Sequence, residues 1–548
     1  MRTQAQVGLA LLFGCWILLP NAASAQTCTV GPFTSSTAVS SLSSSINSAA
    51  NGAVVCLQRG QSWSSGTGLT INTYKSNSAR VTICGSSGSA CSDTGGANPR
   101  ITITGGGACV QFSNSAGGYN ILDLDCYSGN GSNTASAWQI PGGTRDVTID
   151  GAVVDGFFRG AFMGTGTNMP TNIKYGVCGG AGHWVEIRNG PSSMPDGDRH
   201  SIYGGIQNSS IATYVHHFAS SGGNHVNTSH FHDIAEGSVQ WNQSSHDLVI
   251  ECGLYQLDRS QANNIGTSML KIDRGYNLVI RDNTFQVLNG STSVAAIAFA
   301  SHAANGTEGI SGGGVNGAGA QVYRNRFLGV SGVYNELGAD IDVFNNVFDF
   351  TNCSSDCRGA MRQHYQAAAS DDIPISNVRI FNNTIYKGGG PSAFPVISSD
   401  NPGTPTRPLP KNNAIFNNLI YNMDSGTASI FLASQTGCGG YGTNGANIRN
   451  NFIYTPNDST PELLSCSGST GNSAAPYNVN PGLVAVGSAD FSLSSGSVLL
   501  GRGIGAGAPV EDFVRNARPN PPSIGAFDLG VGGVVPLQPP TLIQISGN

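Results

Sequence analysis

A short phrase, built around asparagine and flanked by apolar runs, returns six times in the second half of the chain. The first five copies each follow a short run of alternating or β-branched apolar residues, which is typical of a strand. The spacings between copies are 42, 21, 37, 35 and 33 residues. Repeats of about this length predict a solenoid, here one built from strands. The copies are Asn283-Thr-Phe285, Asn325-Arg-Phe327, Asn346-Val-Phe348, Asn383-Thr-Ile385, Asn418-Leu-Ile420 and Asn451-Phe-Ile453.

The repeated asparagine predicts two features of each coil. Asparagine tolerates the left-handed backbone that a sharp corner needs. Stacked from coil to coil, such residues can also form a ladder of hydrogen bonds. The irregular spacing predicts that one loop per coil varies in length, and such insertions collect on one face, often the binding face.

The chain divides into five predicted segments. Residues 1–25 have the pattern of a signal peptide, with Arg2, an apolar stretch from Val7 to Leu19 and a small-residue cleavage site at Ala23-Ser-Ala25. Residues 26–75 are expected to form an N-terminal cap with a short amphipathic helix from Val39 to Ala50. The β-helix is predicted over 76–470, a C-terminal cap over 471–535 and a flexible tail over 536–548.

Composition and cysteine usage agree with export. Charged residues make up 11% of the chain and glycine 75 of 548 residues, which fits a turn-rich all-β protein. Twelve cysteines follow the signal peptide, an even number suited to disulfides, and no CxxC pair suggests zinc. Their order suggests the pairs Cys28–Cys56, Cys84–Cys91, Cys109–Cys126, Cys178–Cys252, Cys353–Cys357 and Cys438–Cys466.

The same composition limits the classes of partner that the protein is expected to bind. Few lysines and arginines and no basic stripe argue against a nucleic-acid partner. No segment after the signal peptide is apolar for long enough to span a membrane. We therefore expect a soluble monomer, secreted or periplasmic.

Two flanking stretches and the repeated phrase carry a family resemblance. The segment from Gly52 to Trp63 joins an apolar run to a glycine turn and an aromatic residue. Asn480-Pro-Gly-Leu483 and Ser523-Ile-Gly-Ala-Phe-Asp528 belong to a closing segment. Together these resemble secreted right-handed parallel β-helix proteins of the pectate-lyase-like superfamily. The resemblance implies the fold but not the reaction, because this fold hosts lyases, hydrolases, epimerases and simple binders.

Histidine is concentrated in one region, which we expect to hold the active site. Eight of the ten histidines fall between His183 and His246, so stacking could bring them to one face. The catalytic candidates are His225, His230 and His232, of which His230 and His232 share one side of a strand. Metal binding with Asp233 and simple packing in turns are the alternatives.

Basic residues follow this region. Lys271 and Arg274 are candidate catalytic residues, and Arg259 and Asp273 are candidate substrate contacts. This segment resembles one family of β-helix lyases, in which a lysine acts as the base and an arginine as the acid on the strands that line the cleft. Here Ala298-Phe-Ala-Ser-His302 stands where that family has an Arg-His pair, so the arginine is missing. The alternative is a salt-bridged surface turn.

Further contacts complete the predicted site. Asp196 and Asp198 alternate in a glycine-bearing loop, as calcium ligands do, although a solvated loop has the same pattern. His200 and Trp241 are expected to contact substrate. Tyr203, Tyr214 and Tyr255 are further aromatic residues suited to stacking on sugars or to packing.

These observations predict a secreted enzyme that degrades a polysaccharide. Cleavage of an acidic polysaccharide by β-elimination needs a base beside the uronic carboxylate and a cation that stabilises the developing charge. A glycoside hydrolase would need two carboxylates, for which Asp233, Glu236, Asp258 and Asp273 are available. A non-catalytic glycan binder or adhesin is the third alternative.

Overall fold

The computed structural model describes most of the chain after residue 25. The described residues are 26–130, 135–164, 168–178, 184–188, 202–218, 229–231, 245–258, 268–272, 275–288, 295–299, 319–335, 339–353, 357–364, 375–388, 394–400, 411–424, 429–432, 438, 440–457, 468–472 and 478–529. Among them, no helix is long and apolar enough to cross a membrane.

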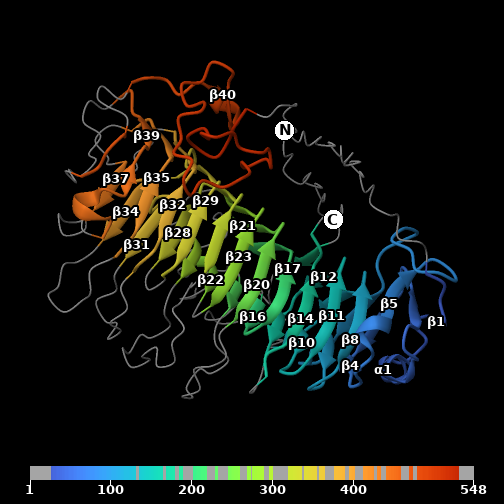
Figure 1. Cartoon of the computed structure of the whole chain (residues 1–548). Helices are drawn as coiled ribbons and strands as arrows, with labels where there is room; N and C mark the ends of the chain where they lie inside the picture. The colour runs from blue at the N-terminus through green and yellow to red at the C-terminus, as the bar shows by residue number, and fades with distance from the viewer. Residues whose placement is uncertain are drawn as a thin grey trace, which may run out of the picture.

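Three long parallel sheets wind along one axis (Figure 1). Sheet 1 contains β1 (Val30–Phe33), β2 (Val54–Gln58), β5 (Val81–Ser86), β8 (Gly117–Leu122), β11 (Arg145–Asp150), β14 (Thr171–Tyr175), β17 (Gln207–Ile211), β20 (His246–Glu251), β23 (Tyr276–Arg281), β26 (Ala320–Tyr323), β29 (Ile341–Phe344), β32 (Arg379–Phe381), β35 (Ala414–Phe416) and β38 (Ile448–Arg449).

Sheets 2 and 3 run beside it. Sheet 2 contains β3 (Ser62–Ser65), β6 (Arg100–Ile103), β9 (Asp125–Ser128), β12 (Val153–Asp155), β15 (Val185–Ile187), β18 (Thr213–Phe218), β21 (Leu254–Asp258), β24 (Thr284–Leu288), β27 (Arg326–Leu328), β30 (Val347–Asp349), β33 (Thr384–Lys387), β36 (Leu419–Asn422) and β39 (Phe452–Tyr454). Sheet 3 contains β4 (Leu69–Ile71), β7 (Val110–Phe112), β10 (Ser136–Ile140), β13 (Arg159–Met163), β16 (Ile202–Gly204), β19 (Ser229–Phe231), β22 (Ser268–Ile272), β25 (Ala295–Phe299), β28 (Ser331–Asn335), β31 (Met361–His364), β34 (Ile397–Asp400) and β37 (Ile430–Leu432).

Each coil visits sheet 1, sheet 2 and sheet 3 in turn, and every strand pairs with its equivalent in the next coil. This confirms the predicted right-handed parallel β-helix. Sheets of 14, 13 and 12 strands agree with the dozen coils expected. At about 4.8 Å per strand the solenoid is roughly 60 Å long. Its first strands, β1 to β4, lie within the segment 26–75.

From β20 onward the corner between sheets 1 and 2 has a constant length, and the other two connections vary. From β20 to β39, the sheet 1 strand is separated from the sheet 2 strand by two residues, such as Asp282 and Asn283 between β23 and β24. Sheet 2 to sheet 3 takes two residues after β27 and nine after β21. Sheet 3 to sheet 1 takes five after β28 and twenty after β25. Thus two connections per coil vary, not one, and both flank sheet 3.

The asparagine of each repeated phrase lies at this constant corner. The buried side chains form the predicted ladder: Nδ2 of Asn346 donates to Oδ1 of Asn383 at 3.0 Å, and Nδ2 of Asn383 donates to Oδ1 of Asn418 at 3.0 Å. The ladder begins at Asn283 and continues to Asn472. The left-handed residue is the one before each ladder asparagine, and not the asparagine itself. These residues are Asp282, Arg324, Asn345, Asn382, Asn417 and Asn450.

Inside the solenoid, equivalent residues of successive coils stack on one another. Tyr255, Phe285, Phe327 and Phe348 form one such interior column, with ring centroids 4.9, 5.3 and 4.4 Å apart. All four side chains are buried in the single large core. Column formation explains why the phrase ends on an apolar residue.

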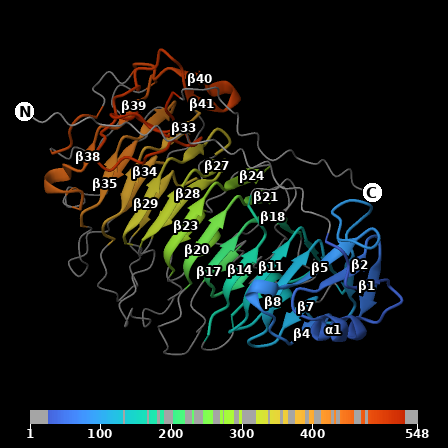
Figure 2. The ribbon, with the colours of Figure 1, turned by 45° about the vertical axis from the view of Figure 1, so that its right-hand side comes forward.

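The helix α1 (Val39–Ser48) packs at the first coil, where it is clear at the blue end of the ribbon (Figure 2). Val39, Leu42 and Ile46 bury their side chains in the core, which confirms the predicted amphipathic helix. Nζ of the buried Lys75 donates to the carbonyls of Asn47 and Ala49, both at 2.8 Å. Since those carbonyls end the helix, the lysine satisfies acceptors that the helix leaves unpaired.

Five of the six predicted disulfides are present: Cys28–Cys56, Cys84–Cys91, Cys109–Cys126, Cys178–Cys252 and Cys353–Cys357. Cys438 is disulfide-bonded, and its predicted partner Cys466 lies outside the described residues. Short 3-10 turns occur at η1 (Asn77–Ala79), η3 (Thr443–Gly445) and η4 (Val486–Ser488).

The C-terminal segment, residues 478–529, folds back over the last coils. It contains the antiparallel pair β40 (Leu483–Ala485) and β41 (Asp490–Leu493). Its apolar residues Phe491, Leu499 and Phe513 form a second core with Val347 and Leu419 on the outer side of sheet 2. Sheet 2 is therefore covered at this end.

Candidate functional site

Sheet 3 carries a continuous row of residues that are in register, one on each strand. Along each strand, the residues before and after Phe162, Tyr203, Lys271 and Arg362 are buried, whereas these four side chains are half-buried. The four side chains therefore point outward, as the two-residue period of a strand requires. We call this the sheet 3 row: Thr70, Gln111, Gln139, Phe162, Tyr203, His230, Lys271, Ala298, Tyr334, Arg362, Ser398 and Phe431, each in register with the next.

Two predicted catalytic residues are neighbours in this row. His230 on β19 is in register with Lys271 on β22. Strand spacing places their Cα atoms about 4.8 Å apart. Ile272 is buried in the core, so Lys271 faces outward as expected.

The middle of the row is aromatic and cationic. The rings of Phe162 and Tyr203 stack with centroids 5.9 Å apart and planes 18° from parallel. The guanidinium of Arg159, on the same strand as Phe162, lies 4.4 Å from the Tyr203 ring centroid. Farther along, the guanidinium of Arg362 lies 5.8 Å from the Tyr334 ring centroid. A basic row lined with aromatic rings suits an acidic sugar chain.

The position after Lys271 in the row carries a small side chain. Ala298 is in register with Lys271, and it is fully buried despite its place in the outward row. It packs with Ala295 and Tyr334, whose side chain is 8% exposed. Tyr334 thus lies against Ala298, one coil beyond Lys271 in the row.

The histidine-rich region does not gather on one face in the part of the chain that the structure describes. His216 and His217 lie on β18 of sheet 2, His230 lies on sheet 3, and His246 begins β20 of sheet 1. A coil passes through all three sheets, so 64 residues distribute their side chains around the solenoid. His246 instead stacks on Tyr276, with ring centroids 4.8 Å apart.

Most of the remaining predicted contacts lie outside the described residues. Tyr255, for which stacking on sugars and packing were both open, is fully buried in the interior column, which agrees with packing. Arg159 and Phe162 were not predicted. The sites that lie outside the described residues are His225, His232, Arg274, His200, Trp241, Arg259, Asp273, Asp196, Asp198 and Asp233.

A second group of charged residues lies on the outer side of sheet 2. Nε of Arg188 is 2.8 Å from Oε1 of Glu186, and this hydrogen bond raises the pKa of Arg188. Burial raises the pKa of the Asp155 carboxyl, and nearby Glu186 raises it further. Tyr127, in register with Asp155, is 38% exposed. This group was not predicted.

Ligand atoms close enough to share a metal ion occur once among the described residues, at Cys56, Cys84 and Cys91. All three sulfurs are in disulfides, so this group is structural. The described residues therefore define a basic, aromatic surface and no metal centre.

Comparison with known proteins gives similarity at the level of solved structures. No protein-family model matches the chain, and no curated protein matches it. The alginate lyase AlyGC of polysaccharide lyase family 6 (an arginine-to-alanine mutant) is 13% identical, with a TM-score of 0.43, over 82% of this chain and 59% of that one. A mannuronic-acid-specific family 6 lyase from human gut microbiota is 11% identical, with a TM-score of 0.46, over 81% and 91%.

An adhesin is among the similar structures too. The surface protein PfbA of Streptococcus pneumoniae is 11% identical, with a TM-score of 0.41, over 82% of this chain and 98% of that one. Lyases and an adhesin thus stand side by side at equally low similarity. The assignment of the fold rests on the strand pairing, and a function has to be argued from the site.

Proposed function

We propose that this protein cleaves an acidic polysaccharide by β-elimination at the sheet 3 row, with His230 and Lys271 at the reaction centre. The observation that carries the proposal is their registered position in adjacent coils, between the Arg159–Tyr203 pair and Arg362. The connections that flank sheet 3 also vary most in length, which is where repeat proteins build binding walls.

The chemistry assigns one role to each residue. His230 removes the proton from the carbon beside the uronic carboxylate, and the electron pair forms a double bond as the glycosidic carbon–oxygen bond breaks. The leaving oxygen takes up a proton from water, and the hydroxide so formed is neutralised by the proton that His230 removed, so atoms and charge balance. The Lys271 ammonium stabilises the negative charge that develops on the carboxylate. The unsaturated sugar end absorbs ultraviolet light.

The test is absorbance of the product on a panel of polyuronates with and without calcium. Lys271→Ala and His230→Ala should each lower turnover about 100-fold or more while melting like the parent. Lys174→Ala is the matched control, since Lys174 is an exposed lysine on β14 of sheet 1. Unchanged turnover in both sheet 3 variants would show that the reaction centre lies elsewhere.

The pH profile separates the two possible bases. A histidine base gives activity that rises near pH 6 to 7, whereas a lysine base requires a more alkaline limb. If the activity of His230→Ala still rises near pH 6 to 7, the base is a residue other than His230.

Hydrolysis is the second candidate, favoured by the raised pKa of Asp155 beside Glu186 on sheet 2. Two neighbouring carboxyls, one of which has a raised pKa, are the arrangement that glycosidases use. In that case reducing ends appear without ultraviolet absorbance, and Asp155→Asn abolishes them while Lys271→Ala does not. A glycan binder would release no sugar ends at all.

A further inference from the structure

Two disulfides lie against each other at the start of the solenoid. Cys56 on β2 is in register with Cys84 on β5, and their Sγ atoms are 3.8 Å apart although they are not bonded to each other. Cys56 is bonded to Cys28, and Cys84 is bonded to Cys91. The two bridges therefore touch through one sulfur atom of each.

The two sulfurs that touch are less exposed than the other two. Cys56 and Cys84 are 0% and 2% exposed, and both pack in a small apolar cluster with Val54. Cys28 and Cys91 are half-buried. Thiol–disulfide exchange requires access to a sulfur atom. A reductant therefore reaches Cys28 or Cys91 first, and the thiolate that leaves is the buried Cys56 or Cys84.

Backbone pairing keeps the inner sulfurs together after one bridge opens. β2 and β5 pair over five successive residues that include Cys56 and Cys84. The Cys28 N–H donates to the Ser89 carbonyl at 2.8 Å, which ties the N-terminal segment to the loop that carries Cys91. These hydrogen bonds do not depend on either disulfide, so opening one bridge leaves its inner sulfur beside the other bridge.

The exchange moves one bond between neighbouring sulfurs. When a dithiol attacks Cys91, it bonds to that sulfur and Cys84 leaves as a thiolate. The Cys84 thiolate then attacks the Cys56 sulfur, 3.8 Å away, and Cys28 leaves as a thiolate. The second thiol of the dithiol displaces Cys91. In total, one dithiol becomes a disulfide, two bridges become one, and the two protons of the dithiol end on the Cys28 and Cys91 thiols. Attack at Cys28 gives the same products.

We propose that the two bridges form a redox switch, in which one dithiol converts them into a single bridge between Cys56 and Cys84. In-register Cα atoms of neighbouring strands are about 4.8 Å apart, within the range that a disulfide spans. Both sulfurs of the new bridge are buried, so the reductant that opened the outer bridges does not reach it. The first two coils thus stay joined under reducing conditions, while Cys28 and Cys91 become free thiols. The switch is independent of the reaction proposed at the sheet 3 row.

The experiment is limited reduction of the native protein. Dithiothreitol is raised stepwise until one of the two bridges opens. Free thiols are then blocked with N-ethylmaleimide at mildly acidic pH, where exchange is slow, and the peptides are mapped by mass spectrometry. Most molecules that have lost one bridge should carry the blocking group on both Cys28 and Cys91, with Cys56 linked to Cys84. Loss of the remaining bridge should be about tenfold slower or more. The inference is overturned if the blocked cysteines are Cys28 with Cys56, or Cys84 with Cys91.

A variant tests the exchange without a reductant. Cys91→Ser leaves the Cys84 thiol beside the Cys28–Cys56 bridge, so exchange should transfer the free thiol to the more accessible Cys28, where N-ethylmaleimide labels it. Cys357→Ser is the matched control, since it opens the Cys353–Cys357 bridge and its free thiol should remain on Cys353. Label on Cys84 alone, or no label at all, in a Cys91→Ser protein that melts cooperatively would contradict the exchange.

Discussion

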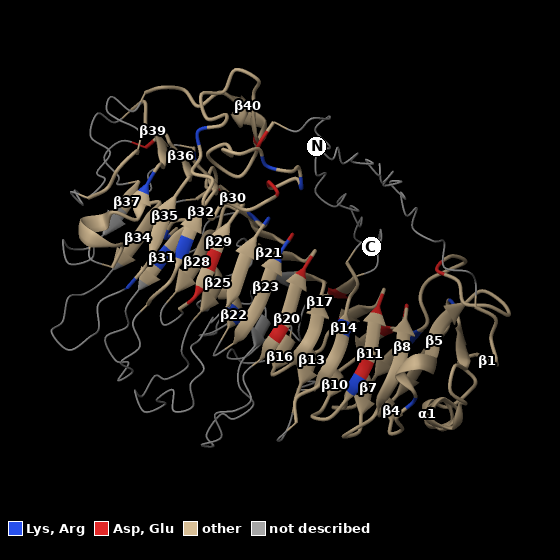
Figure 3. Ribbon diagram, viewed as in Figure 1, with Lys and Arg blue, Asp and Glu red and all other residues tan. Residues whose placement is uncertain are grey.

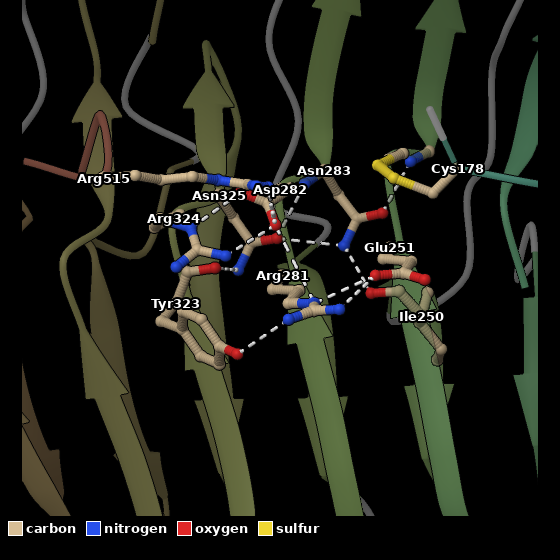
Figure 4. Close-up of a disulfide and its surroundings, with 12 residues drawn as sticks. Cys178, Ile250, Glu251, Arg281, Asp282, Asn283, Tyr323, Arg324, Asn325 and Arg515 are labelled. Carbon is tan, nitrogen blue, oxygen red and sulfur yellow. Dashed lines mark hydrogen bonds and ion pairs between the residues drawn. A yellow bond between two sulfur atoms is a disulfide. The ribbon is translucent and has the colours of Figure 1, made fainter. Parts of the chain in front are cut away.

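Arg515 and Asp282 lie 233 residues apart in the chain, yet Nη2 of Arg515 is 3.2 Å from Oδ2 of Asp282. The same carboxylate accepts two hydrogen bonds from Arg324, at 2.8 and 2.9 Å (Figure 4). Asp282 is the left-handed residue of its corner, so its side chain points away from the solenoid toward the C-terminal segment. Charged residues are otherwise sparse on the ribbon (Figure 3).

The left-handed corner residues thereby act as anchors for the C-terminal segment. Nδ2 of Asn417 donates to the Ile504 carbonyl at 2.9 Å, and Nδ2 of Asn450 donates to the Arg502 carbonyl at 2.8 Å. Arg518 reaches Oδ1 of Asn345 at 2.7 Å. The ladder asparagines therefore join successive coils inside the solenoid, and the left-handed residues before them bind the C-terminal segment outside.

We expect Asp282→Asn to loosen the C-terminal segment without unfolding the solenoid. The neutral amide keeps the volume but loses the charge that pairs with Arg324 and Arg515, which costs about 1 to 2 kcal/mol locally. Limited proteolysis should cut within residues 500–529 sooner than in the parent. Asp342→Asn is the control, because Asp342 pairs with the exposed Arg379 on sheet 1. Equal cleavage in both variants would contradict the anchoring role.

We expect the middle of the asparagine ladder to be more sensitive than its end. Asn383→Ala leaves the Asn346 amide and the Val343 carbonyl without their partners, both buried, at a cost of roughly 2 to 4 kcal/mol. Asn472→Ala removes a partly buried terminal member and should cost about half as much. Hydrogen exchange of the segment 341–349 measures the effect, and similar protection in both variants would count against a cooperative ladder.

Tyr255 predicts a specific alkaline instability. Burial raises its pKa to about 12, above the value of about 10 in the unfolded chain. A raised pKa means that the stabilisation is complete below pH 10 and is lost as the pH rises toward 12, by about 2 to 3 kcal/mol. Tyr255→Phe should therefore lose less stability between pH 9 and 11 than the parent does in urea unfolding. Parallel curves would show that Tyr255 ionises normally in the folded protein.

The buried pair of Lys387 and Asp424 should be costly to break from one side. Nζ of Lys387 is 2.8 Å from Oδ2 of Asp424 and donates to the Phe394 carbonyl at 2.9 Å. Lys387→Met should lower the stability of this coil by about 3 to 5 kcal/mol, because an unpaired carboxylate stays buried. The double variant Lys387→Met with Asp424→Asn should recover much of that loss in thermal unfolding. A double variant no more stable than the single one would mean that the charge is not the cause.

Removal of the disulfide Cys178–Cys252 should destabilise the protein more than removal of Cys353–Cys357. It closes a loop of 74 residues that contains β19 and hence His230. In the chain-entropy model its removal costs about 4 kcal/mol, against about 2 kcal/mol for Cys353–Cys357, which spans four residues. Paired serine variants at each disulfide, compared by melting and by turnover, test this. Turnover should fall more in the first pair of variants.

Much of the fold followed from the sequence because the corner between sheets 1 and 2 has a constant length from β20 onward. Two residues per corner preserve the phrase, so the stacking of Asn346 on Asn383 could be predicted from their neighbours. The disulfides followed because each of the five joins two cysteines that are consecutive in the sequence. The left-handed residue was placed one position late, since asparagine occurs at both positions in several corners.

The site was harder to predict, because the connections around sheet 3 vary. His230 and Lys271 were each named, but their registered contact depends on connections whose lengths carry no periodic signal. Arg159 and Phe162 precede any repeated phrase, and only the alternation of Ala161, Phe162 and Met163 marks an outward side chain. The sequence left Tyr255 open between sugar stacking and packing, because Leu254, Tyr255 and Leu257 leave the inward face of that strand ambiguous.

The two-residue corner also separates the connections that tolerate insertions and deletions from the part of each coil that does not. Because the coils from β20 onward keep that corner, a connection beside sheet 3 can gain or lose residues without displacing Lys271 relative to the coils that follow. Evolution and protein engineering can thus replace the loops beside sheet 3 while the proposed reaction centre keeps its position. Loop grafts next to β22 and β25 should alter which sugar chains are accepted sooner than they alter how a chain is cut.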